Sequence, residues 1–338
     1  MKNNSDEHGL MSEFIGQKFG KWEGEERPLF LAPMSGVTDL PFRLLAKECG
    51  ADVAKFQKRN SKELLTEEQY NAPHPNSHNS YGETYGAHRE FLEFDFSEEK
   101  IVDSVLLNNE FSNFEHANDL IRIPTQLSIP EGYDFSCKIF YHGNPPTSGF
   151  GSFNFDTHNN INHVWTLSEP YGARDWWPCK DDPSDKADSV DIIVTVPSEQ
   201  IVVSNGLLID EQDLPNGKKT YHWSERYPIC TYLVSIATYP YTFWTDTYVG
   251  LNGDTLPLEY YVYPDHYELV YDNYLLTNDM MEVFANKFGE YPFMGEKYGH
   301  VEFGRGGGME HQTISSMGGY SEWLIAVSYT HLTLPTNR

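Results

Sequence analysis

The sequence predicts a mainly β protein, with an antiparallel β-sandwich or saddle over residues 91–264 and the first helix and strands of an α+β domain over residues 265–326. Apolar and acidic residues alternate in FLEFDF, residues 91–96, as expected for a half-buried strand. Short apolar stretches then follow one another, separated by turn clusters such as NPPTSGFG and LPNGKK, which is typical of antiparallel sheets. Between Tyr267 and Phe288 the spacing of apolar residues becomes helical, and Gly289 closes the pattern.

The order of the predicted strands can be read along the chain. They are IVDSVLL, LIRIP, DFSCKIFYH, HVWTL, VDIIVTV, IVVSNGLL, TYHW, TYLVSIAT and LEYYVY. The last twelve residues, VSYTHLTLPTNR (327–338), continue neither a strand pattern nor a capped helix, so we expect a foreign-looking tail there.

A different pattern precedes the strands. Residues 1–27 form a polar tail without an apolar leader, so no secretory signal is visible and the compartment stays open. Residues 28–56 predict a short βα fragment, in which the strand PLFLA is followed by a helix that begins near Asp39 and ends at Gly50. Residues 57–90 are rich in Asn, Pro, Ser, Gly and His and predict a linker.

Composition excludes several classes of partner. The chain has 338 residues, with 24 Lys and Arg against 50 Asp and Glu, and a formal net charge of -26. This charge disfavours binding to nucleic acids or to anionic membranes. No apolar run approaches the roughly 18 residues of a membrane span. The four cysteines form no Cys-x-x-Cys pair, so neither a zinc knuckle nor a disulfide framework is indicated.

GRGGGMEHQT, residues 304–313, is the sharpest local motif. Its glycines leave a stretch of backbone without side chains, which allows an extended peptide to approach closely. The carboxylate of Glu310 follows at once and could bind a ligand ammonium group. The alternative is a glycine-rich turn with a surface glutamate, which composition alone favours.

The segment TLSEPYGARDWWPCKDDPSDKA, residues 166–187, combines Glu169 and Arg174 with two tryptophans and an acidic cluster. Most of it predicts a buried aromatic hairpin in which the arginine pairs with an aspartate. Metal motifs are not found: His-Glu-x-x-His is absent, and His74 and His78 lie in a loop-like stretch without a carboxylate partner.

Together, WTLSEPYGARDWWPCKDDPSDKADSVDIIVTVP and GRGGGMEHQTISSMGGYSEWLIA resemble the zinc aminopeptidases of the aminopeptidase N and leukotriene hydrolase type, over residues 91–326. The second stretch resembles their Gly-x-Met-Glu-Asn motif, with His311 in the place of the asparagine. The resemblance implies that Glu310 and Glu169 bind the free α-amine of a peptide substrate. It implies that Gly307, Gly308 and Met309 contact the substrate backbone.

A pair of carboxylates around one ammonium favours a peptide with a free N-terminus and disfavours an internal segment, which would leave the charges unpaired. We therefore expect Glu169 and Glu310 to converge. Because two close carboxylates repel, the pKa of at least one of them should be raised in the absence of a cation.

In the resembling family a segment like YSEWLIA runs directly into a His-Glu-x-x-His helix, which supplies zinc ligands and the general base. Here VSYTHLTLPTNR follows Ala326, so zinc is the implied cofactor but its ligands are missing. The sequence thus predicts a fragment of a zinc aminopeptidase that retains the amine-binding motif and is inactive, since no ligands remain to activate a water.

PLFLAPMSGVTDLPFRLLAKECGAD, near residues 28–52, resembles the start of the tRNA-dihydrouridine synthases, flavin-dependent TIM-barrel enzymes. The resemblance implies that Pro33 and Met34 contact FMN. One βα unit cannot close a barrel, so FMN is expected only if the fragment were complete. We interpret the chain as a fusion of a synthase fragment and a peptidase β domain. Two alternatives stay open: a non-catalytic peptide-binding β module, and a dihydrouridine synthase fragment.

Overall fold

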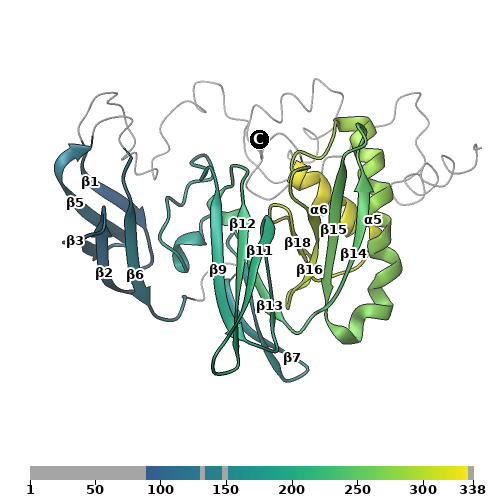
Figure 1. Cartoon of the computed structure of the whole chain (residues 1–338), viewed down its shortest axis with the longest axis horizontal. Helices are drawn as coiled ribbons and strands as arrows, with labels where there is room; N and C mark the ends of the chain where they lie inside the picture. Colours follow the sequence, from purple (N-terminus) through teal and green to yellow (C-terminus); the bar gives the residue numbers. More distant parts are fainter. Residues whose placement is uncertain (1–88, 130–133, 147–150, 334–338) are drawn as a thin grey trace, which may run out of the picture. The chain divides into compact units, whose positions relative to one another are not determined.

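The computed structural model describes residues 89–129, 134–146 and 151–333, all of which belong to one compact unit, Tyr81–Arg338. Strands dominate this part of the chain, and the predicted mainly β fold class is confirmed (Figure 1). The predicted tail 1–27, the βα fragment 28–56 and nearly all of the linker 57–90 lie outside the described residues, as do Pro33 and Met34.

Two three-stranded sheets come first in the chain. Their strand orders are β1-β5-β4 and β3-β2-β6. Buried Phe96, Val105, Ile121 and Ile123 form a core of their own between these strands. The strands are β1 (Arg89–Asp95), β2 (Ile101–Leu107), β3 (Glu110–Ser112), β4 (Glu115–Ala117), β5 (Leu120–Ile129) and β6 (Cys137–His142).

A four-stranded sheet, β10-β13-β8-β7, and a three-stranded sheet, β11-β12-β9, follow. Trp165 of β8 and Trp223 of β12 belong to one buried cluster, which joins the two sheets. The strands are β7 (Ser152–His158), β8 (Ile161–Leu167), β9 (Val190–Pro197), β10 (Ile201–Ser204), β11 (Leu207–Leu214), β12 (Lys218–Glu225) and β13 (Ile236–Tyr239). Short 3-10 turns η1 (Ala173–Asp175) and η2 (Thr231–Leu233) connect them.

The last sheet has five strands in the order β14-β15-β16-β18-β17. Its strands are β14 (Thr242–Val249), β15 (Thr255–Val262), β16 (Tyr298–Glu302), β17 (Gly308–Met309) and β18 (Ser315–Met317). β15 and β16 pair in parallel, which requires a crossover, and the 3-10 turn η3 (Pro264–His266) and helix α5 (Tyr267–Phe288) supply it. The predicted domain boundary at residue 264 therefore falls between paired strands of one sheet.

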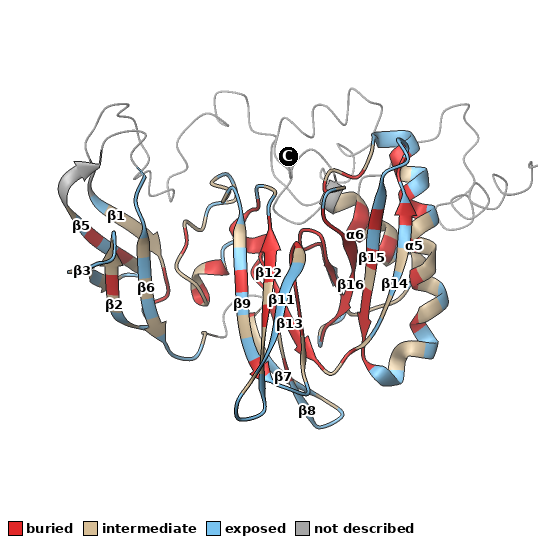
Figure 2. Cartoon of the chain, in the orientation of Figure 1, coloured by how far each residue is buried: buried red, intermediate tan, exposed pale blue. Residues whose placement is uncertain are grey.

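Helix α5 has the bounds that its apolar spacing predicted. Val270, Tyr274 and Met281 are buried in the cluster under the five-stranded sheet, while Phe288 at the helix end is half exposed. Figure 2 shows buried residues on this helix and on β15 and β16. The crossover therefore covers one face of the sheet and leaves the strand edge at β17 open to pairing within the described part of the chain.

The carboxyl-terminal prediction is wrong for residues 327–333. Helix α6 (Glu322–Thr333) continues through them without a break at Ala326. Ile325 and Tyr329 are four residues apart and are both buried in the same cluster as α5, so the apolar face of the helix extends beyond the predicted limit. Residues 334–338 lie outside the described residues.

Two predicted strands are shorter than their apolar stretches. IVVSNGLL is divided into β10 and β11 at Asn205 and Gly206, where Gly206 has a φ of 70°. A Cβ on Gly206 would lie 2.0 Å from the carbonyl oxygen of Ser224, so only glycine fits this close approach. TYLVSIAT begins as η2 and becomes a strand only at Ile236.

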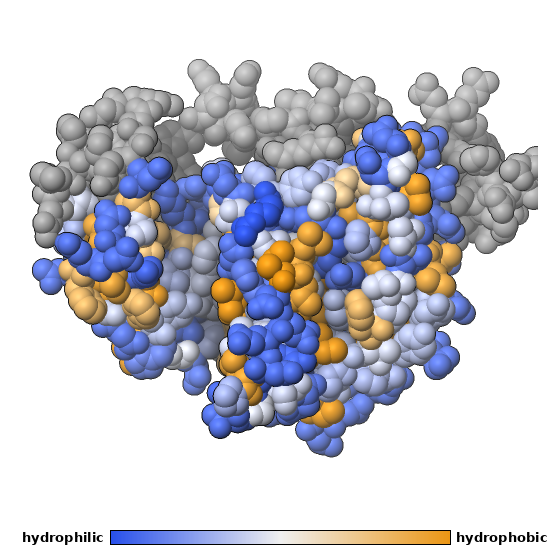
Figure 3. All heavy atoms as spheres, viewed as in Figure 1, coloured by the Kyte–Doolittle hydropathy of each residue, from blue (hydrophilic) through white to orange (hydrophobic). Residues whose placement is uncertain are grey.

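The surface shows isolated apolar groups on the three-stranded sheet that holds β9 and β11 (Figure 3). Ile193, Leu208 and Ile209 are exposed there. Single exposed apolar residues are common on protein surfaces and imply no function. Among the described residues, no helix is both long and apolar enough to cross a membrane.

Candidate amine-binding site

Glu169 and Glu310 come from distant segments of the chain. Glu169 follows β8 in a turn that the backbone closes, since the N–H of Gly172 donates to the carbonyl of Ser168 at 2.8 Å. Glu310 follows the two-residue strand β17, whose Met309 is buried against the cluster of Trp165 and Phe303. A strand end and an anchored turn thus position the two carboxylates.

The two carboxylates lie within electrostatic reach of each other. Burial and, second to it, the negative charge of Glu310 raise the pKa of Glu169 to about 7, while His331 acts in the opposite direction. Glu310 is 7% exposed, and its Oε1 atom accepts no hydrogen bond from the described residues. A raised pKa was expected for carboxylates that converge; the binding of an amine between them stays a prediction.

Tyr232 is a further residue near the pair, and no motif pointed to it because it lies in a stretch predicted as a strand. It is 3% exposed in η2. Burial raises the pKa of its hydroxyl, and the charges of Glu310 and Glu169 add to this rise. Its phenol therefore lies within electrostatic reach of both carboxylates.

His331 is the second residue that the sequence interpretation missed. Its Nδ1 lies 3.6 Å from Oε1 of Glu310, and it is located in the last turn of α6. The resemblance to the zinc aminopeptidases could have pointed to this histidine. If a His-Glu-x-x-His motif began directly after Ala326, its five positions would be 327–331, and His331 would be the final histidine.

The glycine-rich segment lies at the edge of the five-stranded sheet. Gly306, Gly307 and Gly308 are exposed, and a Cβ on Gly306 or Gly307 would meet no atom within 4 Å. Gly307 has a φ of 93°, which favours glycine, and its carbonyl already accepts the N–H of Gly318 at 2.7 Å. The carbonyl of Met309 likewise accepts the N–H of His311 at 3.0 Å, so a peptide strand that pairs with this edge would find two of its carbonyl groups occupied.

His311 points into the protein rather than toward a ligand. It is fully buried, its Nδ1 lies 2.9 Å from the hydroxyl of Ser316, and burial lowers its pKa to about 3. The imidazole is therefore neutral and adds no charge to the carboxylate pair. The replacement of asparagine by histidine leaves the carboxylate of Glu310 in place.

One asparagine ties the segments of the site together. The side-chain amide of Asn205 donates to the carbonyls of Leu233 and Gln312, at 2.9 and 2.6 Å, and its oxygen accepts the N–H of Ser235 at 2.7 Å. Asn205 thereby fixes the segment that carries Tyr232 against the one that follows Glu310. All three contacts are buried, so each would be costly to lose.

The residues around Glu310 do not fit the zinc ligand set implied by the resemblance. Of the five positions after Ala326, only His331 offers a ligand nitrogen, and Ser328 instead donates to the sulfur of Met317 at 3.6 Å. Among the described residues, the one group of three His, Cys, Asp or Glu side chains with metal-binding geometry lies elsewhere, at His158, Asp265 and His266. No catalytic step through zinc is derived for this site.

The match to known families falls on two parts of the chain. Residues 87–233 match the Peptidase M1 N-terminal domain. This part of the chain is M1 aminopeptidase-like. Residues 44–110 match the NeuB family, which is different from the synthase family that we expected near residues 28–52. The expected dihydrouridine synthase fragment gains no support.

Solved structures share the fold of the M1-like region and of the strands after it. An M1 zinc metallopeptidase from Deinococcus radiodurans has a TM-score of 0.63 and 22% identity, covering 72% of this chain and 56% of that one. Aminopeptidase A from Legionella pneumophila, in complex with aspartic acid, has a TM-score of 0.62 and 18% identity, covering 73% of this chain and 30% of that one. At these identities the likeness shows the fold alone.

Curated relatives match shorter stretches. A putative aminopeptidase-2 of Caenorhabditis elegans is 28% identical over 150 residues, which are 42% of this chain and 8% of the relative. N-acetylneuraminate-9-phosphate synthase of Mus musculus is 36% identical over 138 residues, which are 39% of this chain and 36% of the synthase. The chain thus spans well under half of the length of either relative.

Proposed function

We propose that the chain binds the free N-terminal amine of a peptide through Glu169, in the M1-like region, and Glu310, in the five-stranded sheet that follows it. The observation that carries the proposal is a carboxylate pair, half-buried Glu169 and buried Glu310, in which burial and the charge of Glu310 raise the pKa of Glu169 and Oε1 of Glu310 accepts no hydrogen bond from the described residues. An ammonium group between the carboxylates would relieve their repulsion and supply the missing donors.

The ligand class follows from the surroundings of the pair. The edge strand β17 offers an exposed glycine backbone beside Glu310, which suits an extended peptide rather than a free amine alone. A mutant of the Deinococcus metallopeptidase was solved with a Tyr-Ser-Ala substrate, which supports a peptide as the ligand of this fold. Gly307, Gly308 and Met309 would contact its backbone only, because the Met309 side chain is buried.

The test is calorimetry with a dipeptide amide and with its N-acetylated counterpart. We expect the free amine to bind with a Kd near 1 mM, about −4 kcal/mol, and the acetylated peptide to bind at least tenfold more weakly. Glu310→Gln and Glu169→Gln should each abolish this preference. Glu199→Gln, an exposed carboxylate on the turn between β9 and β10, is the matched control and should change nothing. Equal binding of both peptides would contradict the proposal.

The second candidate, a β module that binds peptides without recognising the amine, rests on the same open edge at β17. It predicts that both peptides bind and that a proline in the pairing position abolishes binding, while Glu310→Gln does not. The calorimetry therefore separates the two functions.

We further propose that the 338-residue polypeptide binds peptides without hydrolysing them. Its sequence contains no His-Glu-x-x-His, and His331 supplies a single imidazole. Aminoacyl-arylamides should stay intact with the purified polypeptide, with or without added zinc. Hydrolysis that a chelator stops would contradict this. The identity of residues 28–52 and a fusion of two proteins stay predictions.

A further inference from the structure

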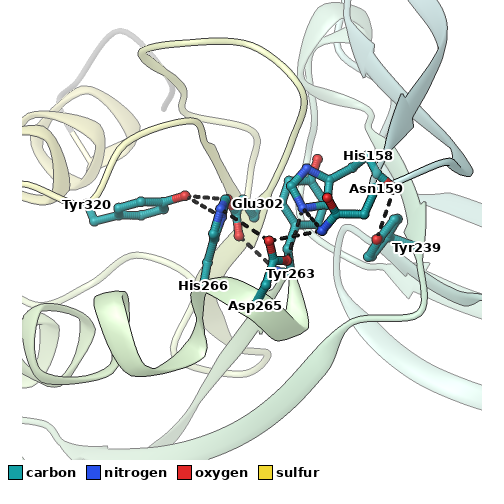
Figure 4. A network of polar contacts seen from close by, with 8 residues as sticks. All are labelled: His158, Asn159, Tyr239, Tyr263, Asp265, His266, Glu302 and Tyr320. Atoms are coloured by element: carbon teal, nitrogen blue, oxygen red, sulfur yellow. Dashed lines mark hydrogen bonds and ion pairs between the residues drawn. The ribbon is translucent and has the colours of Figure 1, made fainter.

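A second cluster of polar side chains lies where the β7–β8 hairpin meets the start of helix α5. His158 is the last residue of β7, and Asp265 and His266 belong to η3. Each offers one ligand atom, and these atoms all lie within 4.8 Å of one another. Figure 4 shows the Asp265 carboxylate between the two imidazoles. None of the three residues belongs to the motifs of the amine site.

The orientation of the His266 ring is fixed by contacts on its Nδ1 side. Its Nδ1 lies 2.6 Å from Oε1 of Glu302, whose side chain is 3% exposed, and the hydroxyl of Tyr320 bonds to the same carboxylate oxygen (Figure 4). A carboxylate accepts hydrogen bonds, so Nδ1 carries the proton and the lone pair is on Nε2. A histidine whose far nitrogen donates to a carboxylate is the usual arrangement of a metal-binding imidazole.

His158 is held with similar firmness. Its ring stacks on Tyr263 with the centroids 3.9 Å apart and the planes at 16°. The hydroxyl of Tyr239 donates to its backbone carbonyl at 3.2 Å. Tyr263 is in turn fixed by its N–H, which donates to Oε2 of Glu302 at 2.8 Å. Glu302 therefore supports both imidazoles, one directly and one through Tyr263.

The cluster leaves a gap on the His266 side. Nε2 of His158 lies 3.0 Å from Oδ1 of Asp265, but Nε2 of His266 is 3.8 Å from Oδ2, which is too long for a hydrogen bond. The side chain of Asp265 is 47% exposed, so the gap is open to solvent. Ligands of one zinc ion lie about 2.0–2.2 Å from it, so two of them are less than about 4.4 Å apart, and small side-chain rotations suffice to reach this spacing.

We propose that His158, Asp265 and His266 form a binding site for a divalent transition-metal ion of the zinc type. Two imidazoles and one carboxylate suit such borderline ions, whereas calcium and magnesium prefer oxygen ligands only. The ion joins the β7–β8 hairpin to the start of α5, which are 107 residues apart in the chain. Glu302 is a positioning residue for this site.

The experiment is a titration of the full 338-residue chain with zinc ions, followed by calorimetry. We expect one site that is lost, with affinity at least tenfold lower, in Asp265→Asn and in His266→Gln, and that is weakened in Glu302→Gln. His142→Gln is the matched control, because His142 pairs with Asp103 at 3.0 Å without a second imidazole and should not affect binding. Circular dichroism without metal checks that each variant folds.

A second readout separates a real site from the acidic surface. Zinc should raise the melting temperature of the wild-type chain and of His142→Gln, and leave that of His266→Gln unchanged, because a ligand stabilises only the state that binds it. Calcium at the same concentration should raise none of them. The proposal is overturned if zinc does not bind, if its affinity is the same in all variants, or if calcium acts as zinc does.

Discussion

Two carboxylate pairs in the described part of the chain, Glu225 with Glu296 and Glu169 with Glu310, differ in the charge that lies beside them. Glu225 and Glu296 are 0% and 5% exposed, and Lys297 is fully buried next to them. Glu169 and Glu310 have His331 beside them and no lysine or arginine among the groups that shift the pKa of Glu169. The first pair therefore has a buried lysine of the fold beside it, whereas the second has a histidine.

Lys297 interacts with the first pair through its charge, and its ammonium group is held in place by other contacts. Its Nζ donates to the carbonyls of Ser204 and Gly206 and lies 4.5 Å from the centre of the Trp223 ring. Burial lowers its pKa to about 8, so the group is still mostly charged at neutral pH. Burial and the neighbouring Glu225 raise the pKa of Glu296.

The largest expected effect is a loss of stability when the lysine beside Glu225 and Glu296 is replaced. Lys297→Met leaves two buried carbonyls without their donor and two carboxylates without their cation, so the free energy of unfolding should fall by about 3–5 kcal/mol. Urea denaturation measures it. Lys218→Met, at an exposed lysine of β12, should change it by less than about 0.5 kcal/mol. Equal stability of the two variants would show that Lys297 does not compensate the pair.

Glu310→Gln should change the stability in the opposite direction and make the folded chain more stable. It removes a like charge near Glu169, so the pKa of Glu169 should fall from about 7 toward its ordinary 4.5, and stability at pH 7 should rise by up to about 1 kcal/mol. A carbon-13 NMR titration of the Glu169 carboxyl measures the pKa. An unchanged pKa in the variant would mean that burial alone causes the rise.

The titration of Glu169 should contribute to the pH dependence of stability. Its pKa is higher in the folded chain than in the unfolded chain, so the folded state binds more protons between about pH 4.5 and 7. Its contribution is therefore greatest below pH 4.5 and is lost as the pH rises to about 7. Glu169 is partly exposed, so the loss should be on the order of 1 kcal/mol. Thermal unfolding of the wild type and of Glu169→Gln across this range should differ by that slope.

The smallest effect concerns His331. Its positive form lowers the pKa of Glu169, so His331→Gln should raise that pKa by less than Glu310→Gln lowers it. The same NMR titration measures both variants. A fall of the pKa in His331→Gln would show that the histidine does not act as a cation here.

Local patterns in the sequence predicted those elements whose formation depends on residues close to each other in the chain. The apolar spacing of residues 267–288 predicted α5, because helix burial repeats every three to four residues. The break at Asn205 and Gly206 was missed, since it depends on how closely Ser224 approaches from another strand. The end of α6 was missed because Tyr329 is buried by α5, which the tail sequence does not reveal.

The candidate site shows the same division. Glu169 and Glu310 were found through a resemblance between two motifs, not through spacing, because 141 residues of chain separate them. Tyr232 has no motif of its own and joins the site only through tertiary structure. His158 and Asp265 were missed for the same reason. A lone histidine at the end of a strand and an aspartate after a proline form no motif, and only the fold brings them together.

The contacts of Asn205 also set an order in time. Its amide bonds to Gln312, which is synthesised 107 residues later. At a synthesis rate of about 5–20 residues per second, this is a delay of roughly 5–20 s. During that interval the amide hydrogen of Asn205 that later bonds to Gln312 must bond to water, and Glu310 is not yet present beside Glu169. If the pair binds a peptide N-terminus as proposed, a nascent chain that has already folded its early sheets does not yet have this site, which is completed when the segment after β17 docks.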